Sequence, residues 1–127
     1  MTSITTISVA MFTVSNQDDA IDFYTDKLGW EVKSDVGWGE GDQAGRWVEV
    51  APPSSTTHLA LNPPMGGQPG GGGIGVETPD LDGEYARLSA LEGVQVGEPM
   101  GGEGPVPRMF SVGDPDGNWI WVVQARQ

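Results

Sequence analysis

The chain has 127 residues, no cysteine, and 18 acidic against 6 basic residues, which gives a net charge of −12. This length suits one domain, or two half-sized modules that share a core. The lack of cysteine excludes disulfides and thiolate metal sites, and the negative field disfavours binding to nucleic acids. The acidity either attracts a cationic small molecule or only keeps the protein in solution.

The N-terminal segment has no basic leader, and residues 4–14 alternate polar with apolar side chains. Such alternation is typical of a strand and fits neither a signal peptide nor a membrane span. We therefore expect a cytoplasmic protein that does not bind membranes.

The first half of the chain predicts one helix among four strands. Alternation and turn residues predict strands at 4–14, 30–36, 46–51 and 57–61. The segment SNQDD at 15–19 offers an N-cap candidate with acidic residues in the first turn, and apolar residues then recur at helical spacing up to Leu28. Gly29 stands where a helix-ending glycine belongs.

The second half repeats this order after a segment rich in proline and glycine. The predicted strands are 74–78, 94–97, 109–112 and 119–123, and a helix capped by Asp80 ends at Gly93. No periodic structure fits the glycine-rich segment. The predicted organisation is therefore a first module at 1–64, a linker at 65–73 and a second module at 74–127.

The two halves can be matched residue by residue. Val9 falls on Gly73, Arg46 on Arg108, and His58 on Trp119, with a drift that shortened turns explain. The matched arginines indicate a structural role at the module edges.

The predicted fold class is α+β: two tandem βαβββ modules, whose curved mixed sheets surround a concave cavity and carry their helices on the outer face. The cavity forms within one chain or between two paired chains. Alternation puts Leu59, Leu61, Ile120 and Val122 on the helix-packed faces. The residues predicted to face the cavity are Val9, Met11, Trp47, Glu49, His58, Ala60, Gly73, Gly75, Glu77, Met109, Ser111, Trp119 and Trp121. Trp38, in the loop after the second strand, is placed to close over the mouth.

Two segments carry a family resemblance. The segment AIDFYTDKLGW at 20–30 and the segment DPDGN at 114–118, in this order and spacing, resemble the vicinal oxygen chelate superfamily. That superfamily includes glyoxalase I, extradiol dioxygenases and bleomycin-resistance proteins. The resemblance implies the βαβββ scaffold and spans nearly the whole chain.

Metal-using members of this superfamily take His and Glu ligands from the first and last strands of each module. The matching positions here are Val9, Ala60, Gly73 and Trp121, none of which offers a donor side chain. We therefore predict no metal and no cofactor. The alternative is a displaced metal site built from His58 with Glu49, Glu77 or Asp35. Without such a site, His58 is a polar strand residue near a turn.

The leading hypothesis is a metal-independent protein that binds a planar or cationic small molecule such as an antibiotic. Its predicted ligand-binding residues are Val9, Met11, Trp38, Trp47, Glu49, His58, Trp119 and Trp121, since indole faces bind planar rings and cations. The tryptophans either line the cavity or fill a closed core. The resemblance also implies a homodimer and a role in antibiotic resistance.

The alternative hypothesis is an enzyme of the same superfamily. One variant is a metal-dependent lyase or dioxygenase with atypical ligands. The other is metal-free and uses Glu49 and His58 as acid–base groups.

Overall fold

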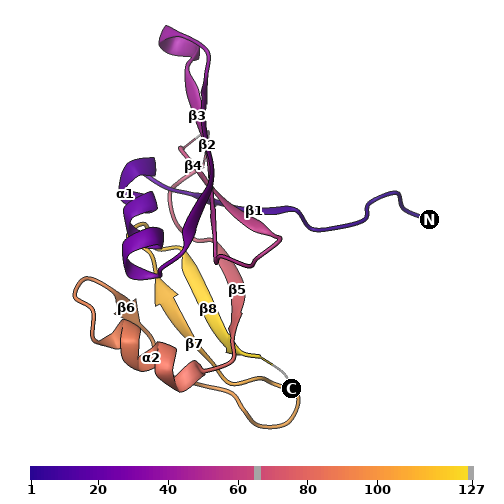
Figure 1. Cartoon of the computed structure of the whole chain (residues 1–127), viewed down its shortest axis with the longest axis vertical. Helices are drawn as coiled ribbons and strands as arrows, with labels where there is room; N and C mark the ends of the chain where they lie inside the picture. Colours follow the sequence, from indigo (N-terminus) through magenta and orange to yellow (C-terminus); the bar gives the residue numbers. More distant parts are fainter. Residues whose placement is uncertain (65–66, 126–127) are drawn as a thin grey trace. The chain divides into compact units, whose positions relative to one another are not determined.

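The chain divides into two compact units, residues 1–68 and 69–127, and we describe each by itself (Figure 1). The structure is a computed structural model, and it describes residues 1–64 and 67–125. Each unit holds one four-stranded mixed sheet and one main helix, so the fold class is α+β, as predicted.

Unit 1 has the βαβββ order predicted for the first module. Its elements are β1 (Val9–Thr13), α1 (Gln17–Asp22), a π-helical turn (Phe23–Lys27), β2 (Glu31–Trp38), a 3-10 turn (Gly41–Gln43), β3 (Gly45–Ala51) and β4 (His58–Asn62). The strand order in this sheet, sheet A, is β1-β4-β3-β2. β1 runs parallel to β4, and the other pairs are antiparallel. The antiparallel pair β2 and β3 forms a long hairpin (Figure 1).

The helix of unit 1 begins and ends where the sequence predicts. Asn16 Oδ1 accepts a hydrogen bond from the backbone N–H of Asp19 at 2.9 Å, and Gly29 follows the helix with a φ of +79°. The core joins this helix to the sheet through fully buried side chains such as Tyr24, Val48 and Leu61. Burial of these apolar side chains is the main term that stabilises the unit.

The first strand is shorter than predicted. β1 begins at Val9 and not at Ile4, and the side chains of Ile4 and Ile7 are 80% and 79% exposed. Alternation alone does not make a strand, because the backbone also needs a neighbouring strand to pair with.

Unit 2 repeats the architecture. Its elements are β5 (Gly73–Thr78), α2 (Leu81–Ser89), β6 (Gln95–Val96), β7 (Met109–Gly113) and β8 (Trp119–Gln124). The strand order in this sheet, sheet B, is β5-β8-β7-β6, with β5 parallel to β8. Val9 pairs with His58 in sheet A and Gly73 with Trp119 in sheet B, as the internal sequence match predicts.

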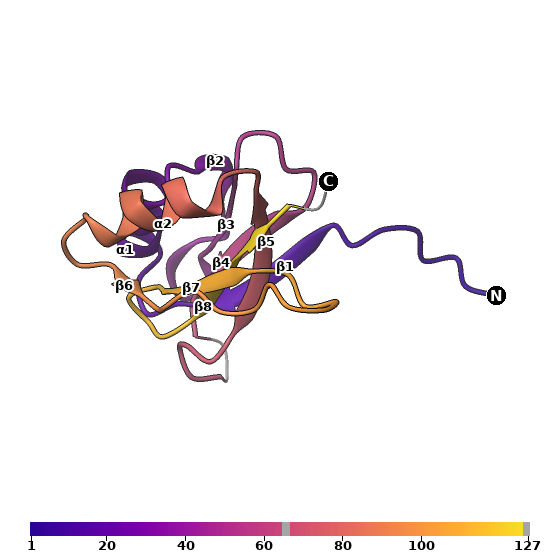
Figure 2. The ribbon, with the colours of Figure 1, turned by 90° about the horizontal axis from the view of Figure 1, so that it is seen from below.

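The helix α2 lies along one face of sheet B (Figure 2). Asp80 caps it, with Oδ1 accepting from the N–H of Gly83 at 3.0 Å. Tyr85 contacts the buried Phe110 edge-on, with 5.3 Å between ring centroids. Gln124 Oε1 accepts from the N–H of Leu81 at 3.1 Å, which ties the helix start to β8.

The last part of the predicted linker belongs to unit 2. Gly72 donates its N–H to Asn118 Oδ1 at 3.0 Å, and Gly71 donates to the carbonyl of Gly117 at 3.1 Å. The buried Asp114 organises the turn before β8, because its Oδ1 accepts hydrogen bonds from the backbone N–H groups of Asp116 and Asn118 at 2.9 Å each. The first two predicted linker residues, 65–66, lie outside the described residues.

Across residues 1–64 and 67–125, no helix combines the length and the apolar content needed to cross a bilayer.

Candidate functional site

Side-chain alternation gives each sheet a face packed on the helix and a face that points away from it. The residues predicted to pack on the helices, Leu59, Leu61, Ile120 and Val122, are all buried. Their strand neighbours point to the opposite side, since successive side chains in a strand alternate. We call this second side the helix-free face of each sheet.

The helix-free face of sheet A carries apolar residues around three polar or aromatic side chains. By register, Val9 and Met11 stand beside His58 and Ala60, and Glu49 stands on the other side of Ala60. Met11 is 57% exposed, whereas Val9, Glu49 and His58 are half-buried. Ala60 is fully buried between its two larger neighbours, so it offers no surface to a ligand.

Trp47, Glu49 and His58 form one hydrogen-bonded chain. Trp47 Nε1 donates to Glu49 Oε2 at 2.5 Å, and Glu49 Oε1 lies 2.7 Å from His58 Nδ1. The Trp47 hydrogen bond first, and the His58 hydrogen bond second, hold the pKa of the Glu49 carboxyl below its usual value, despite the opposing effect of desolvation. Sequence reasoning selected these residues one at a time. The antiparallel pairing of β3 with β4 brings them into contact.

Trp38 does not lie in a loop, and this part of the prediction is wrong. β2 continues to Trp38, which pairs with Gly45 at the end of the hairpin. The indole covers Gly45 so closely that a Cβ at residue 45 would overlap the ring. Trp38 remains 53% exposed. The hairpin extends this far because a glycine leaves room for the ring.

The helix-free face of sheet B is built from indoles and small residues. Trp119 is 40% exposed and stands between Gly73 and Gly113, while Trp121 is half-buried between Gly75 and Ser111. The ring of Trp119 leans toward Gly113, where a Cβ would come within 3.1 Å of it. A Cβ at Gly75 would meet no atom within 4 Å. The two β5 glycines therefore leave a bare strip of backbone beside the indoles.

The side chains at the family's metal positions do not fit a metal. Val9, Ala60, Gly73 and Trp121 offer no imidazole or carboxylate. No group of three or more His, Cys, Asp or Glu residues within 1–64 and 67–125 is arranged to hold an ion. The four residues outside these ranges are Met, Gly, Arg and Gln, which are not members of that donor set.

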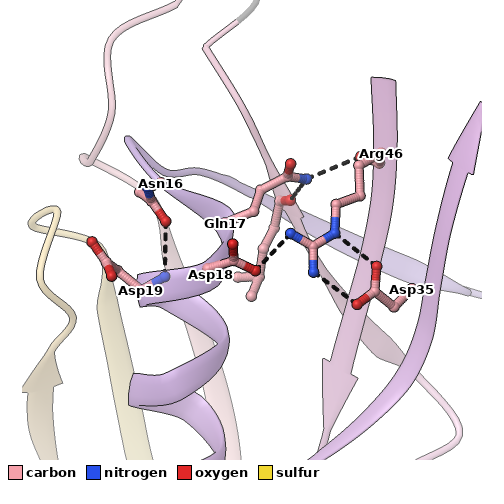
Figure 3. A network of polar contacts seen from close by, with 7 residues as sticks. Asn16, Gln17, Asp18, Asp19, Asp35 and Arg46 are labelled. Carbon is pink, nitrogen blue, oxygen red and sulfur yellow. Dashed lines mark hydrogen bonds and ion pairs between the residues drawn. The ribbon is translucent and has the colours of Figure 1, made fainter. Parts of the chain in front are cut away.

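Asp35 is not available to a displaced metal site. It lies on the helix side of sheet A, where Arg46 binds both of its carboxylate oxygens (Figure 3). Arg46 holds the pKa of the Asp35 carboxyl below its usual value. Glu77 is exposed on the helix-free face of β5.

Comparison with solved structures finds close relatives over nearly the full chain. TnmS3, an antibiotic binding protein from Streptomyces sp. CB03234, is 32% identical with a TM-score of 0.82, and the match covers 99% of this chain and 100% of that one. A superfamily member from Sphaerobacter thermophilus DSM 20745 is 34% identical with a TM-score of 0.78, covering 96% and 98%. A glyoxalase/bleomycin resistance protein from Streptomyces sp. CB03234 is 32% identical with a TM-score of 0.78, covering 94% and 100%.

A search of curated proteins found no match. The family model described as Glyoxalase/Bleomycin resistance protein/Dioxygenase superfamily matches residues 6–122. This match takes in both helices, every strand except the last two residues of β8, and all the residues of the helix-free faces described above. The chain therefore belongs to the glyoxalase/bleomycin resistance protein/dioxygenase superfamily.

Proposed function

We propose that this chain is a metal-independent binding protein for a planar or cationic small molecule of the antibiotic type. The observation that carries the proposal is the position of Trp121. In the family's metal-using members a ligand to the metal stands there, and here an indole stands between Gly75 and Ser111. The antibiotic-binding relative TnmS3 supports the same class of function.

Metal independence follows from the chemistry of the side chains. A protein-bound divalent ion of the zinc type needs about three donor side chains at a catalytic centre. The four family positions supply none, and His58, the one histidine, already has Nδ1 bonded to Glu49. No step of the proposed function therefore passes through a metal.

The surface beside Trp121 suits a flat ring. The exposed backbone at Gly73 and Gly75 has no side chain above it, and the indoles of Trp119 and Trp121 border it. A planar ligand laid on this strip gains dispersion contact with the backbone and stacking or edge contact with the indoles. A cationic ligand gains a further cation–π term of about 0.5–2 kcal/mol per ring.

The charge of the chain supports a cationic ligand. The net charge of −12 raises the local concentration of cations by long-range attraction. Glu49 on the helix-free face of sheet A and the exposed Glu77 on that of sheet B are each a carboxylate that can anchor a positive group. Trp47 and His58 each form a hydrogen bond with one oxygen of Glu49, so Glu77 has more capacity to bind a cationic group.

A homodimer is part of the proposal. The helix-free face of sheet A exposes Met11, Val36 and Trp38 by 57%, 57% and 53%. Exposed apolar side chains gathered on one face favour association with a second surface. A second copy of the chain is the partner that supplies such a surface in most soluble oligomers.

The second candidate function is metal-free acid–base catalysis. The direct contact between Glu49 and His58 favours it, since a carboxylate bonded to one imidazole nitrogen orients the other toward a substrate. Turnover of a bound ligand distinguishes this candidate from simple binding.

The test is native mass spectrometry of the purified protein, combined with elemental analysis and titration with a planar cationic acridine dye. We expect no stoichiometric Zn, Ni, Mn or Fe, and quenching of tryptophan fluorescence by the dye. One tightly bound metal ion per chain would overturn metal independence. A dye that leaves the fluorescence unchanged would overturn the planar-cation site.

A further inference from the structure

The edge of sheet A at β1 has backbone groups that a further strand can pair with. β1 is the outermost strand of the sheet, and β4 is its one hydrogen-bonded neighbour within residues 1–64 and 67–125. The carbonyl of Ser8 accepts from the N–H of His58, so the even-numbered residues of this strand turn their backbone groups toward β4. The backbone groups of Val9 and Met11 therefore point to the outer edge.

The opposite edge of the sheet, at β2, is protected against such pairing. The register of β2 is interrupted between Val32 and Ser34, and the strand carries charges at Glu31, Lys33 and Asp35. Bulges and charged side chains on an edge strand hinder the addition of another strand. β1 has neither feature, because its register with β4 is continuous and its sequence VAMFT is uncharged. Of the two edges of sheet A, the one at β1 is therefore the one open to pairing.

Residues 2–8, which we call the N-terminal arm, have the composition of a strand. The arm has the sequence TSITTIS, every residue in it is exposed, and it extends away from sheet A in both views (Figures 1 and 2). Threonine and isoleucine favour extended backbone, and residues 1–17 contain no charged side chain. An exposed and uncharged segment of this kind, with isoleucines at 4 and 7, favours association with another strand.

We propose that the N-terminal arm pairs antiparallel with β1 of a second copy of the chain, and that the two copies exchange their arms around a two-fold axis. The inference rests on the homodimer in the proposed function, because it names the segments that join the two chains. A two-fold contact presents the same segment on both sides. Two uncharged segments can meet without bringing together the acidic side chains of two copies that each carry a net charge of −12.

Symmetry and side-chain direction restrict the register. Directly opposite residues of two paired strands lie on the same face, so a two-fold axis pairs odd-numbered residues with odd and even with even. With Ile7 on the axis, Val9 lies opposite the partner's Thr5 and Met11 lies opposite the partner's Ser3. The backbone groups at the outer edge of β1 then all have partners on the arm.

This register also gives both exposed isoleucines an accessible apolar neighbour. Ile7 lies opposite the partner's Ile7, and Ile4 lies opposite the partner's Ala10, which is half-buried. A shift that set Ile4 opposite Phe12 would offer it no surface, since Phe12 is fully buried. Thr57 Oγ1 donates to the Ile7 carbonyl at 2.9 Å, and the second lone pair of that oxygen can accept from the partner.

The first experiment uses the absence of cysteine from the chain. Ile7→Cys sets two thiols directly opposite each other in the dimer, with Cα atoms about 5.5 Å apart, which is within the range of a disulfide. Mild oxidation should therefore convert most of this variant to a covalent dimer on a non-reducing gel. Ile4→Cys is the matched control, because it is as exposed on the same arm but its two copies lie six residues apart, about 20 Å. Failure of Ile7→Cys to cross-link, or equal cross-linking of Ile4→Cys, would overturn the proposal.

The second experiment compares two proline variants of the arm by light scattering over a range of concentrations. Thr5→Pro removes an N–H that donates to the partner's Val9, and the two-fold axis repeats the loss, so the dissociation constant of the dimer should rise about tenfold or more. Thr6→Pro removes an N–H that points away from the partner, and it should dimerise as the wild type does. Both positions are exposed and outside the core, so both variants should fold. Equal dissociation constants for the two variants would overturn the proposal.

The outcomes separate this inference from the proposed function. A wild-type dimer that neither cross-links through Ile7→Cys nor weakens in Thr5→Pro keeps the homodimer and overturns the exchange of arms. A wild-type monomer at micromolar concentration overturns both. Titration of the same samples with the acridine dye tests the ligand site independently, so a dimer that shows the expected cross-link but binds no dye supports the exchange of arms and overturns the planar-cation site.

Discussion

Arg46 binds Asp35 on the neighbouring strand with two hydrogen bonds, from Nε to Oδ1 at 2.7 Å and from Nη2 to Oδ2 at 2.8 Å (Figure 3). Its remaining Nη1 donates to Asp18 in the first turn of α1 at 2.7 Å. One guanidinium therefore ties β2, β3 and α1 together. In unit 2, Arg108 at the matching position binds Asp82 in the first turn of α2 at 2.6 Å. The structural role predicted for the two arginines is confirmed.

Asp35→Asn should lower the melting temperature of the protein slightly at neutral pH, because the pair is partly exposed to solvent. The folded-state pKa of Asp35 is lowered, so its contribution is present above the unfolded pKa of about 3.9. It is lost as the pH falls through the folded value. The difference in melting temperature between wild type and variant should therefore vanish in strong acid. Asp42→Asn makes the same charge change in an exposed turn and is the control. A constant difference at all pH values would contradict the assignment.

Trp121→Ala should separate a ligand-binding indole from a core indole. We expect binding of the acridine dye to weaken by about 1–3 kcal/mol, as for loss of a stacked aromatic anchor. The melting temperature should fall little, because the ring is only half-buried. A loss of about 3–5 kcal/mol in unfolding free energy would instead identify a core residue. Trp30→Phe is the matched control, since Trp30 packs against Tyr24 with 5.3 Å between ring centroids and lies outside the proposed site.

Gly75→Val should abolish dye binding while leaving the protein folded. The added side chain meets no atom at Cβ, and the backbone there is ordinary extended strand. Removing a strand glycine should leave the melting temperature unchanged or raise it, because Gly costs about 0.5–1 kcal/mol in such positions. The branched side chain occupies the bare strip beside Trp121. Gly67→Val, also unobstructed and outside the strip, should bind the dye as the wild type does. Unimpaired binding by Gly75→Val would show that the ligand does not lie on β5.

The mass in solution should be that of two chains. Light scattering at micromolar concentration tests this, and a mass near that of one chain would contradict the homodimer. Met11→Glu, on the exposed apolar face of sheet A, should weaken the dimer because it places a charge among apolar side chains. Val106→Glu, at a position 50% exposed in a loop of unit 2, is the control.

The sequence by itself determined the order of helices and strands, the repeat and the faces of the strands. Periodicity, caps and helix-ending glycines are local signals, so the helices at 17–27 and 81–89 begin after Asn16 and Asp80 as expected. Alternation correctly assigned Leu59, Leu61, Ile120 and Val122 to the buried faces, because a strand has a period of two. The family resemblance, carried by 20–30 and 114–118, is confirmed as well.

Tertiary structure alone decided which polar groups meet. Glu49 and His58 are separated by a turn, and only the register of β3 against β4 brings their atoms to 2.7 Å. Asp35 carries a carboxylate, which is a common metal ligand. The register of β2 nevertheless places it on the helix side of sheet A, where it binds Arg46. The strand at 4–8 failed for the same reason, since pairing needs a neighbouring backbone that a local pattern does not specify. Local sequence sets the period and direction of side chains, whereas contacts across strands depend on register, which is a property of the assembled sheet.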